Sequence, residues 1–450
     1  MYTLKFTLKQ HTPNIHFQHD QEGATLRATE VKPKLDRALI KKIGNGNYDH
    51  GVIIARERKW ITSMNSDSLD LKMKIQASAN FEYPVNVPRL DRENHVDRDN
   101  RGNPRSEGFP CFFGNMGDAN RENEKKFVYA QNRVYIKINT NCESLFLFME
   151  KGDGYKTIAR FFNTENFGTR QSKGFGSFSV IKENGEMDFE ISRYYFDVYL
   201  RNRNINQLKT QHQIRFPRVQ MTDEQLILVD HWRQVFNNIN LFHKVLKSGY
   251  NQQRGYVKST LFKYFKDEHN IQWDKKTIKE VYFNDKLSRH QDNHPDEDIL
   301  LFDEEEQKIA SSRNHMFLVR DLLGLTSQAE WNREYNNAVI SKTNSEIDRF
   351  KSPVTYKPIL RSDEEGDFFS VFIFLHEIPE EFLNKPFNVT VNNHGTLVLD
   401  TPDRSKFTTS KYFEYLAGDS FAIEDLVNSE NADTDTISDM FNMLKPQENE

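Results

Sequence analysis

The sequence is poor in cysteine and has no long apolar run. Its two cysteines, Cys111 and Cys142, are not in a CxxC spacing, which argues against a disulfide framework or a zinc ribbon and favours a reducing compartment. No segment is long and apolar enough to cross a membrane, and the N-terminal MYTLKFTLKQ alternates apolar and polar residues, unlike a signal peptide. We therefore expect a cytoplasmic protein without a membrane partner.

An excess of positive charge is also absent. The 61 lysines and arginines are outnumbered by 66 acidic residues, so the net charge is −5. A polyanion would therefore have to be bound by a local cluster of cations and not by the chain as a whole. The 450 residues leave room for two or three domains, and the 35 phenylalanines predict an aromatic-rich core with a minority of rings left for stacking on bases.

The common catalytic and cofactor motifs are missing too. There is no Walker loop, no GxGxxG after a parallel strand, no HExxH and no Ser-His-Asp elbow. His11, His16 and His19 with Asp20 suggest a metal or acid–base site, but their spacing matches no standard set of ligands. The sequence therefore predicts no cofactor and no metal, and it leaves the catalytic residues, if there are any, unknown.

The N-terminal region carries a clear pattern of strands and a helix. Residues 2–9 alternate strictly, with apolar side chains on one face and Thr3, Lys5, Thr7 and Lys9 on the other. A helix is expected from Thr29 to Gly44, and further alternating runs follow. The order strand, helix, strand, strand, helix, glycine-rich loop, strand predicts an α+β fold of the ferredoxin-like or RRM-like kind, with antiparallel sheets and long insertions.

Changes of composition along the chain predict its segments. A capping box formed by Thr222 and Gln225 opens a long helix in the second half. The predicted segments are, in order, a ferredoxin-like domain (1–200) with a polar insertion (80–126), a basic linker (201–220), a helical segment with a second, smaller ferredoxin-like domain (221–418), and an acidic, disordered tail (419–450).

The stretch FGTRQSKGFGSFSV, residues 167–180, combines flexibility with positive charge just before a predicted strand. It contains Gly168, Gly174, Gly176, Arg170 and Lys173. Glycine tolerates positive φ and lets backbone N–H groups approach an anion closely, while the two cations add charge. This composition suits a phosphodiester backbone. A flexible turn with solvated charges accounts for the same residues equally well.

A second group of cations surrounds the start of the first predicted helix. Its members are Arg27, Lys32, Lys34 and Arg37. The amino end of a helix favours anions, so these side chains are candidates for a phosphate-binding surface. Taken alone, they also fit an ordinary solvated helix face.

Together these motifs resemble the RAMP superfamily, the RNA-binding subunits of CRISPR effector complexes. FGTRQSKGFGSFSV resembles the glycine-rich loop of that family, and TLRATEVKPKLDRALIKK resembles its lysine-rich helix start, although Pro33 and Asp36 depart from the usual pattern. RFKSPVTYKPILR, residues 349–361, resembles the entry to a terminal strand. The resemblance implies that Arg170 and Lys173, with the amides of Gly174 and Gly176, contact guide RNA (crRNA), and that Lys32 and Lys34 assist. Arg27 and Arg37, at the same helix start, are further candidates for RNA binding.

The resemblance also implies a place in a type III-like effector complex, with crRNA, target RNA and other effector subunits as partners. The expected function is that of a non-catalytic RNA-binding subunit. One alternative is a metal-independent endoribonuclease that processes precursor crRNA, with His16 or His19 as its base. Asp91, Asp97 and Asp99 could supply a target-cutting aspartate. A protein scaffold without RNA binding is the other alternative.

Overall fold

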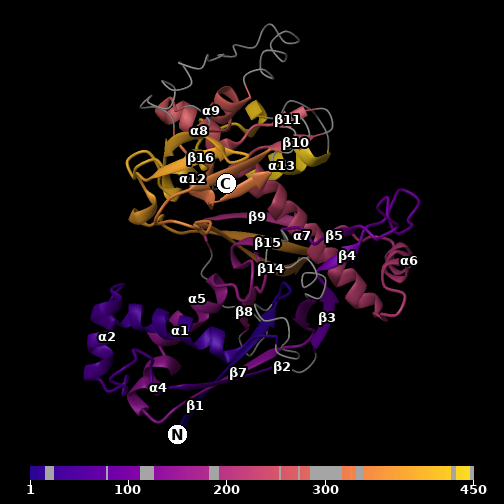
Figure 1. Ribbon diagram of the computed structural model, residues 1–450. Helices are drawn as coiled ribbons and strands as arrows, with labels where there is room; N and C mark the ends of the chain where they lie inside the picture. The colour runs from indigo at the N-terminus through magenta and orange to yellow at the C-terminus, as the bar shows by residue number, and fades with distance from the viewer. Residues whose placement is uncertain are drawn as a thin grey trace. The chain divides into compact units, whose positions relative to one another are not determined.

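The computed structural model of the chain divides into two compact units (Figure 1). Unit 1 comprises Met1–Asn240 and Tyr356–Phe374, and unit 2 comprises Leu241–Thr355 and Leu375–Glu450. The described residues are 1–15, 25–77, 80–111, 126–181, 192–252, 255–271, 274–283, 317–325, 327–330, 338–426 and 432–445. Both units combine helices with small antiparallel sheets, so the predicted α+β class is confirmed. Unit 1 extends beyond the predicted domain 1–200.

Unit 1 begins with a four-stranded antiparallel sheet in the order β2-β7-β1-β8. The elements that build it are β1 (Tyr2–Gln10), α1 (Ala28–Ile43), β2 (Lys72–Ala77), β7 (Val134–Thr140), α5 (Asp153–Thr164) and β8 (Phe178–Ile181). In chain order these elements run βαββαβ, and the first strand lies between the third and the fourth. This is the ferredoxin-like arrangement that the sequence predicts.

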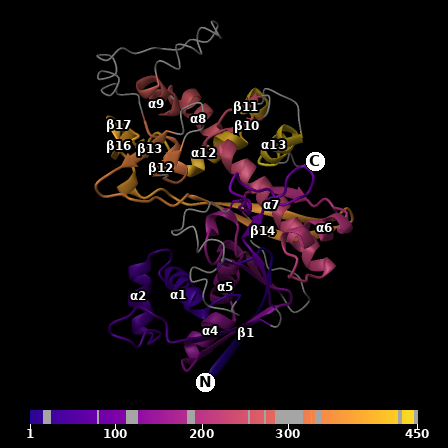
Figure 2. The ribbon, with the colours of Figure 1, turned by 45° about the vertical axis from the view of Figure 1, so that its right-hand side comes forward.

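The alternating pattern of the strands decides which face of this sheet is buried. Helices α1 and α5 lie on one side of the sheet (Figure 1, Figure 2). Leu4, Phe6 and Leu8 of β1 are buried in one core with residues of these two helices. Two further helices, α2 (Tyr48–Glu57) and α4 (Glu143–Glu150), pack on α1 and α5. The core formed in this way includes Leu4, Phe6, Leu8, Val31, Leu35, Leu39, Ile136, Ile138, Ile158, Phe162, Phe178 and Val180. Burial of these apolar side chains is the main force that holds the sheet to its helices.

Helix α1 begins one residue before the predicted position. Its N-cap is Arg27, which has extended backbone angles and makes no side-chain cap, and Thr29 lies inside the first turn with its side chain exposed. Pro33 is tolerated near the helix start because a proline there removes few backbone hydrogen bonds. The helix ends at Gly44, whose N–H donates back to Ile40 O, as the sequence predicts.

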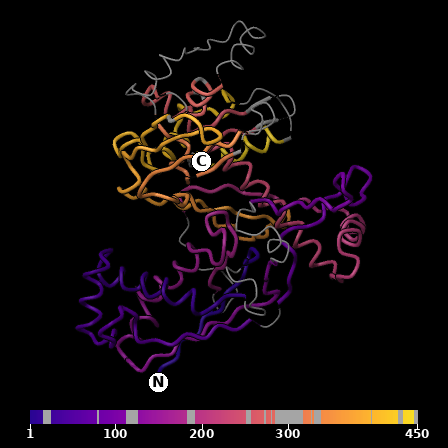
Figure 3. Tube along the Cα trace, viewed as in Figure 1, coloured from indigo at the N-terminus to yellow at the C-terminus, as the bar shows by residue number. Residues whose placement is uncertain are grey.

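The polar insertion forms a two-stranded ribbon (Figure 3). Its strands are β3 (Asn80–Pro84), β4 (Asn86–Pro88), β5 (Ser106–Gly108) and β6 (Lys126–Ala130), paired β3 with β6 and β4 with β5. The carboxylate of Asp91 accepts hydrogen bonds from the N–H groups of Glu93 and His95, and that of Asp99 from the N–H groups of Arg101 and Asn103. These two aspartates therefore shape turns of the ribbon, while Asp97 pairs with Arg89 and Arg105.

The predicted basic linker contains a helix, α6 (Ile205–Arg215). Three of its cations are held by carboxylates: Arg203 by Asp230, Lys209 by Asp223, and Arg215 by Glu107 of the ribbon. Helix α7 (Asp223–Lys247) follows, and the predicted capping box is confirmed, because Thr222 and Gln225 exchange side-chain to backbone hydrogen bonds of 3.1 and 3.2 Å.

Among the described residues, the part of the chain after β8 forms three further sheets, one of them the β10-β11 pair. In unit 1, β9 (Tyr194–Tyr199) pairs with β15 (Gly366–Leu375), which follows β14 (Val354–Asp363). Unit 2 contains β12 (Gln328–Glu330), β13 (Val339–Thr343), β16 (Pro386–Val391) and β17 (His394–Asp400), in that spatial order, with β10 (Tyr250–Gln252), β11 (Gly255–Val257), α8 (Thr260–His269), α9 (Asp274–Tyr282) and α12 (Thr409–Ala417). In the order β12-β13-β16-β17 each strand lies beside the one that precedes it in this sheet, while β14 and β15 belong to another sheet, so this sheet differs from the second ferredoxin-like sheet that the sequence predicts.

The acidic C-terminal segment also differs from the prediction of a disordered tail. It forms α13 (Ala432–Asn442), and the Phe441 ring stacks on Phe242 with 4.6 Å between ring centroids. Ile437, Met440, Phe441 and Leu444 are all buried. Their spacing of three or four residues makes an apolar helical stripe that the acidic composition obscured. None of the helices described is long and apolar enough to cross a membrane.

A buried ion pair in unit 2 gives a first prediction. Lys342 and Asp321 lie 2.5 Å apart and are almost fully buried. Burial alone would raise the pKa of Asp321, but the cations Lys342, Lys247 and Arg320 hold it below the ordinary value. Replacing Lys342 by Met leaves the carboxylate without its closest cation, so we expect the free energy of unfolding to fall by about 3–5 kcal/mol.

Urea denaturation measures this loss, and Lys385→Met is the matched control. Lys385 pairs with the exposed carboxylate of Glu346 at 3.2 Å, so its loss should cost about 0.5 kcal/mol or less. Adding Asp321→Asn to Lys342→Met should recover part of the stability. Equal stabilities of the two single variants would show that the buried pair contributes nothing.

Candidate functional site: the glycine-rich loop and the start of the first helix

The glycine-rich loop joins α5 to β8 through a tight turn. A short 3-10 turn, η1 (Gln171–Lys173), lies at its tip, and Arg170 and Gly174 on either side of it have left-handed backbones with φ of 57° and 93°. Gly168 and Gly176 also have positive φ, of 78° and 67°. A β-carbon on Gly176 would lie 2.0 Å from the carbonyl oxygen of Phe167. The loop therefore requires glycine for its own backbone path.

The amides of the loop donate to groups within the protein. Gly168 N–H donates to the Glu30 carboxylate at 2.7 Å, Gly176 N–H to Pro13 O at 2.8 Å, and Gly174 N–H to Gln171 O at 3.1 Å. The sequence assigned these amides to phosphate contacts. In the structure they fix the loop to the segment after β1 and to α1, because a buried backbone donor must be paired internally.

Side chains at both ends of the loop donate hydrogen bonds to carbonyl groups of strand β14. Ser177 Oγ donates to Pro358 O, and Asn166 Nδ2 to Tyr356 O, each at 2.7 Å. Lys357 is fully buried and its ammonium donates to Phe162 O and Glu165 O at the carboxyl end of α5, at 2.9 and 2.6 Å. Burial lowers the pKa of Lys357 well below its ordinary value. The segment that resembles a family strand entry thus forms the base on which the loop rests.

Lys173 of the loop packs against the same segment of β14. Its Nζ is buried and lies 5.9 Å from the centroid of the Tyr356 ring. The sequence assigned Lys173 to RNA, but this placement lets it pack against Tyr356 and does not present its charge at the surface. Arg170, the other cation of the loop, is half-buried at the left-handed position before η1.

The start of α1 and the loop are joined by one carboxylate and one amide side chain. Glu30 accepts from Gly168 N–H, and also from Gln171 Nε2 at 3.2 Å. Lys34 donates to Gln171 Oε1 at 3.1 Å and lies 5.2 Å from the centroid of the Phe167 ring. The structure therefore brings Lys34 together with the loop. The sequence analysis missed Glu30 and Gln171, although an acid in a first helical turn is a signal for backbone amides nearby.

The other cations of α1 point elsewhere. Lys32 pairs with Asp36 at 2.6 Å and also donates to Leu69 O. Arg37 is exposed and lies 5.7 Å from the centroid of the Tyr48 ring, toward α2. Arg27, at the N-cap, is half-buried. Lys34 therefore contacts the loop, whereas Lys32 is paired with a carboxylate on α1 itself.

His11 has a structural role. Its ring accepts from Leu360 N–H at Nδ1, at 3.2 Å, and lies 2.7 Å from Ser179 Oγ through Nε2. The ring is fully buried, and burial, with further contributions from Lys9 and Lys357, lowers its pKa well below the ordinary value. His16, His19 and Asp20 lie outside the described residues. Among the residues described, no three His, Cys, Asp or Glu side chains are grouped to hold a metal ion.

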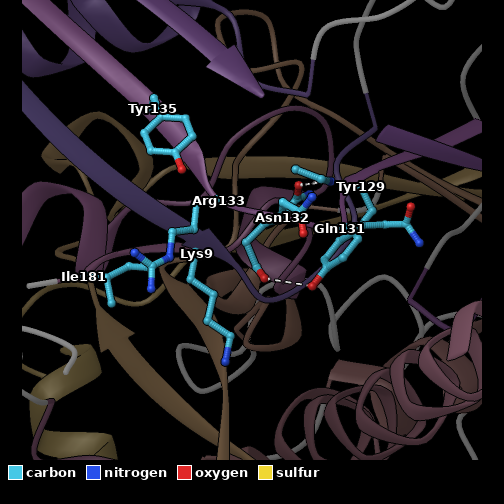
Figure 4. Close-up of a pocket in the computed structure, with 9 residues that line it drawn as sticks. Lys9, Tyr129, Gln131, Asn132, Arg133, Tyr135 and Ile181 are labelled. Atoms are coloured by element: carbon cyan, nitrogen blue, oxygen red, sulfur yellow. Dashed lines mark hydrogen bonds between the residues drawn. The ribbon is translucent and has the colours of Figure 1, made fainter. Parts of the chain in front are cut away.

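A pocket opens at the end of the four-stranded sheet where β1 ends and β7 begins. It has a volume of about 570 Å³ and is lined by Lys9, Gln10, Tyr129, Ala130, Gln131, Asn132, Arg133, Tyr135 and Ile181 (Figure 4). Burial lowers the pKa of Lys9, and Asp367 opposes this effect. None of the residues that line this pocket was predicted from the sequence to be a site residue.

Substituting one loop glycine tests how tightly the loop is held. In Gly176→Ala the new methyl group meets the Phe167 carbonyl at 2.0 Å in a backbone with positive φ, so we expect a loss of about 3 kcal/mol or more in the free energy of unfolding. Gly46→Ala is the control, because its φ of +96° is equally unusual but nothing lies within 4 Å of the added atom. Its cost should be about 1 kcal/mol. Equal losses in thermal or urea unfolding would contradict the predicted overlap.

The neutral state of His11 predicts a dependence of stability on pH. The unfolded histidine takes up a proton as the pH falls through about 6.5, while the buried ring stays neutral. The unfolded state is then favoured, and we expect His11 to remove about 1 kcal/mol of stability between pH 7.5 and 5.5. Urea unfolding of His11→Gln across this range should give a flatter profile. A profile parallel to that of the native chain would show that His11 takes up a proton in the folded state as readily as in the unfolded state.

Two protein-family models match this chain. The family model for the Cmr1 N-terminal domain matches residues 1–250, and that for the Cmr1 C-terminal domain matches residues 256–445. The chain is similar to a crystal structure of apo Cmr1 from Pyrococcus furiosus, at 11% identity over 84% of this chain and 90% of that one, with a TM-score of 0.31.

A second similar structure is a chain of the cryo-EM structure of the Type III-B Cmr-beta bound to cognate target RNA. The identity is 10% over 83% of this chain and 94% of that one, with a TM-score of 0.36. A comparison with curated proteins gives no match. Because the two family models together span almost the whole length, the RAMP-type relationship predicted from the sequence is confirmed, and the chain belongs to the Cmr1 family.

Proposed function

We propose that the chain is the Cmr1 subunit of a Type III-B Cmr effector complex and that it binds crRNA through cations around the glycine-rich loop. Its partners are then crRNA, target RNA and the other subunits of the complex, in the cytoplasm. Membership of the Cmr1 family supports this proposal, as does the description of a similar solved chain as part of a Cmr assembly bound to target RNA.

The observation that carries the proposal is the attachment of the loop to the start of α1. Glu30 and Gln171 join the two segments, and this places Lys34 beside the turn that carries Arg170. Arg27 lies at the N-cap of the same helix, and Arg37 is exposed on its next turn. These side chains can bind successive phosphates of one strand, since phosphate contacts need positive charge at a fixed position.

In this proposal the glycines set the backbone path of the loop and do not themselves contact RNA. Their amides are bonded inside the protein, so Gly168, Gly174 and Gly176 fix the path of the loop and leave the contact with RNA to side chains. Lys173, which packs against Tyr356, likewise helps to hold the loop in place. The endoribonuclease alternative gains no support from His11, which is buried and neutral. A target-cutting aspartate gains none from Asp91 or Asp99, which shape turns.

Replacing Arg170 and Lys34 together by alanine tests the proposal. We expect the affinity of the purified full-length chain for a crRNA of guide length to fall on the order of tenfold, because two phosphate contacts are removed. The slope of log K against log salt should decrease by about 1.4. Fluorescence anisotropy with labelled RNA at several salt concentrations measures both quantities.

Lys32→Ala is the matched control on the same helix. Lys32 is held by Asp36 on the side away from the loop, so its loss should leave the affinity within about twofold of the native value. Lys173 is left intact because its burial over Tyr356 would mix an effect on folding with an effect on binding. Native affinity in the Arg170→Ala/Lys34→Ala variant would refute binding at this loop, and a native chain without salt-dependent RNA affinity would favour the protein scaffold.

A further inference from the structure

The face of the four-stranded sheet that turns away from α1 and α5 carries cations on three adjacent strands. In the register of the sheet, Lys137 of β7 lies directly opposite Lys5 of β1 on one side and Lys74 of β2 on the other. All three side chains are exposed. We call Lys5, Lys74 and Lys137 the lysine row.

The charge of the lysine row is not compensated. Strands β1, β2, β7 and β8 contain no aspartate or glutamate. In the described part of the chain no carboxylate forms an ion pair with any member of the row. Like charges directly opposite each other on neighbouring strands are unfavourable, so the row weakens the sheet unless an anion lies across it. On the helical side, by contrast, Lys32 pairs with Asp36 and Lys42 with Asp153.

An aromatic ring lies next to the row on the same face. Tyr135 is two residues before Lys137 on β7 and is 52% exposed. Its direct neighbours across the sheet are Thr7 and Gln76. Tyr135, Arg133 and Lys9 all line the pocket described above (Figure 4), so that pocket adds two further cations to the wall that carries the ring.

We propose that this face binds a single-stranded segment of RNA, with phosphates on the lysine row and a base stacked on Tyr135. The inference deepens the proposed function and rests on it, since it assigns the same class of ligand to a second surface of unit 1. An aromatic ring among cations on the open face of an antiparallel sheet is the arrangement that holds unpaired bases.

The neutral neighbours favour RNA over an acidic protein surface. Thr7 and Gln76 flank the exposed ring. On the opposite side of the lysine row, Thr3 and Asn139 are paired across β1 and β7, and the Thr3 hydroxyl donates to Asn139 at 2.8 Å. Hydroxyl and amide groups beside a stacking ring can bond to base edges and 2′-hydroxyls. An acidic protein would use the lysines but would leave the ring at the surface without a base to stack on.

Charge reversal and ring removal test the two parts of the surface separately. Lys5→Glu/Lys74→Glu/Lys137→Glu replaces one like-charged row by another, so the sheet keeps a comparable repulsion. We expect at least a tenfold loss of affinity for a fluorescein-labelled 15-nucleotide oligouridylate and a salt slope smaller by about 2. Tyr135→Ala should lower the affinity by at least fivefold with little change of slope, while Tyr135→Phe should bind as the native chain.

Two variants separate binding from folding and from total charge. Lys137→Glu alone places one acid between Lys5 and Lys74, so the full-length chain should melt at the same or a higher temperature and still bind RNA more weakly. Lys41→Glu/Lys151→Glu/Lys156→Glu makes the same change of net charge at exposed positions of α1, α5 and the segment before α5. This control should stay within about threefold of the native affinity.

The outcomes distinguish this inference from the proposed function. If the lysine-row and Tyr135→Ala variants bind the oligouridylate as tightly as the control, the inference is overturned, and the face serves an acidic protein or no partner. The proposed function still stands in that case, provided Arg170→Ala/Lys34→Ala weakens crRNA binding. The reverse result supports the sheet face and refutes the loop.

Discussion

The glycine-rich loop is built on one close approach of two backbones. Gly176 lies so near the Phe167 carbonyl that any side chain would overlap it, and its N–H donates to Pro13 O. This contact joins the two ends of the loop to the segment that follows β1. The left-handed turn at Arg170, the attachment of Glu30 and the position of Lys34 all depend on it, because each is anchored to a residue between 166 and 176.

Internal bonding of the loop amides changes what the loop can do chemically. A loop with unbonded amides could wrap an anion as a phosphate-binding nest does. Here the three glycine amides are bonded within the protein, and Lys357 beneath them satisfies carbonyls at the end of α5. The loop is therefore a rigid support. Whatever charge it offers comes from side chains held at fixed positions by that support.

Local patterns were enough to predict the first sheet but not the contacts of the loop. Alternation in residues 2–9 identified the first strand and its two faces, and the capping box at Thr222 located α7. The partners of the loop come from distant parts of the chain. Lys357 donates a hydrogen bond to the carbonyl oxygen of Phe162, which lies 195 residues away in the sequence, and no local pattern predicts such a contact. The burial of Lys173 over Tyr356 escaped prediction for the same reason.

The net charge of −5 hides an uneven distribution over the two sides of the first sheet. On the helical side Lys32 and Lys42 are paired with Asp36 and Asp153, which limits their attraction for another anion. The open side has lysines and no acids on its four strands. Since the strand alternation alone places Lys5, Lys74 and Lys137 on one face, and the register then sets them opposite each other, the positive field of this face is a direct consequence of the fold.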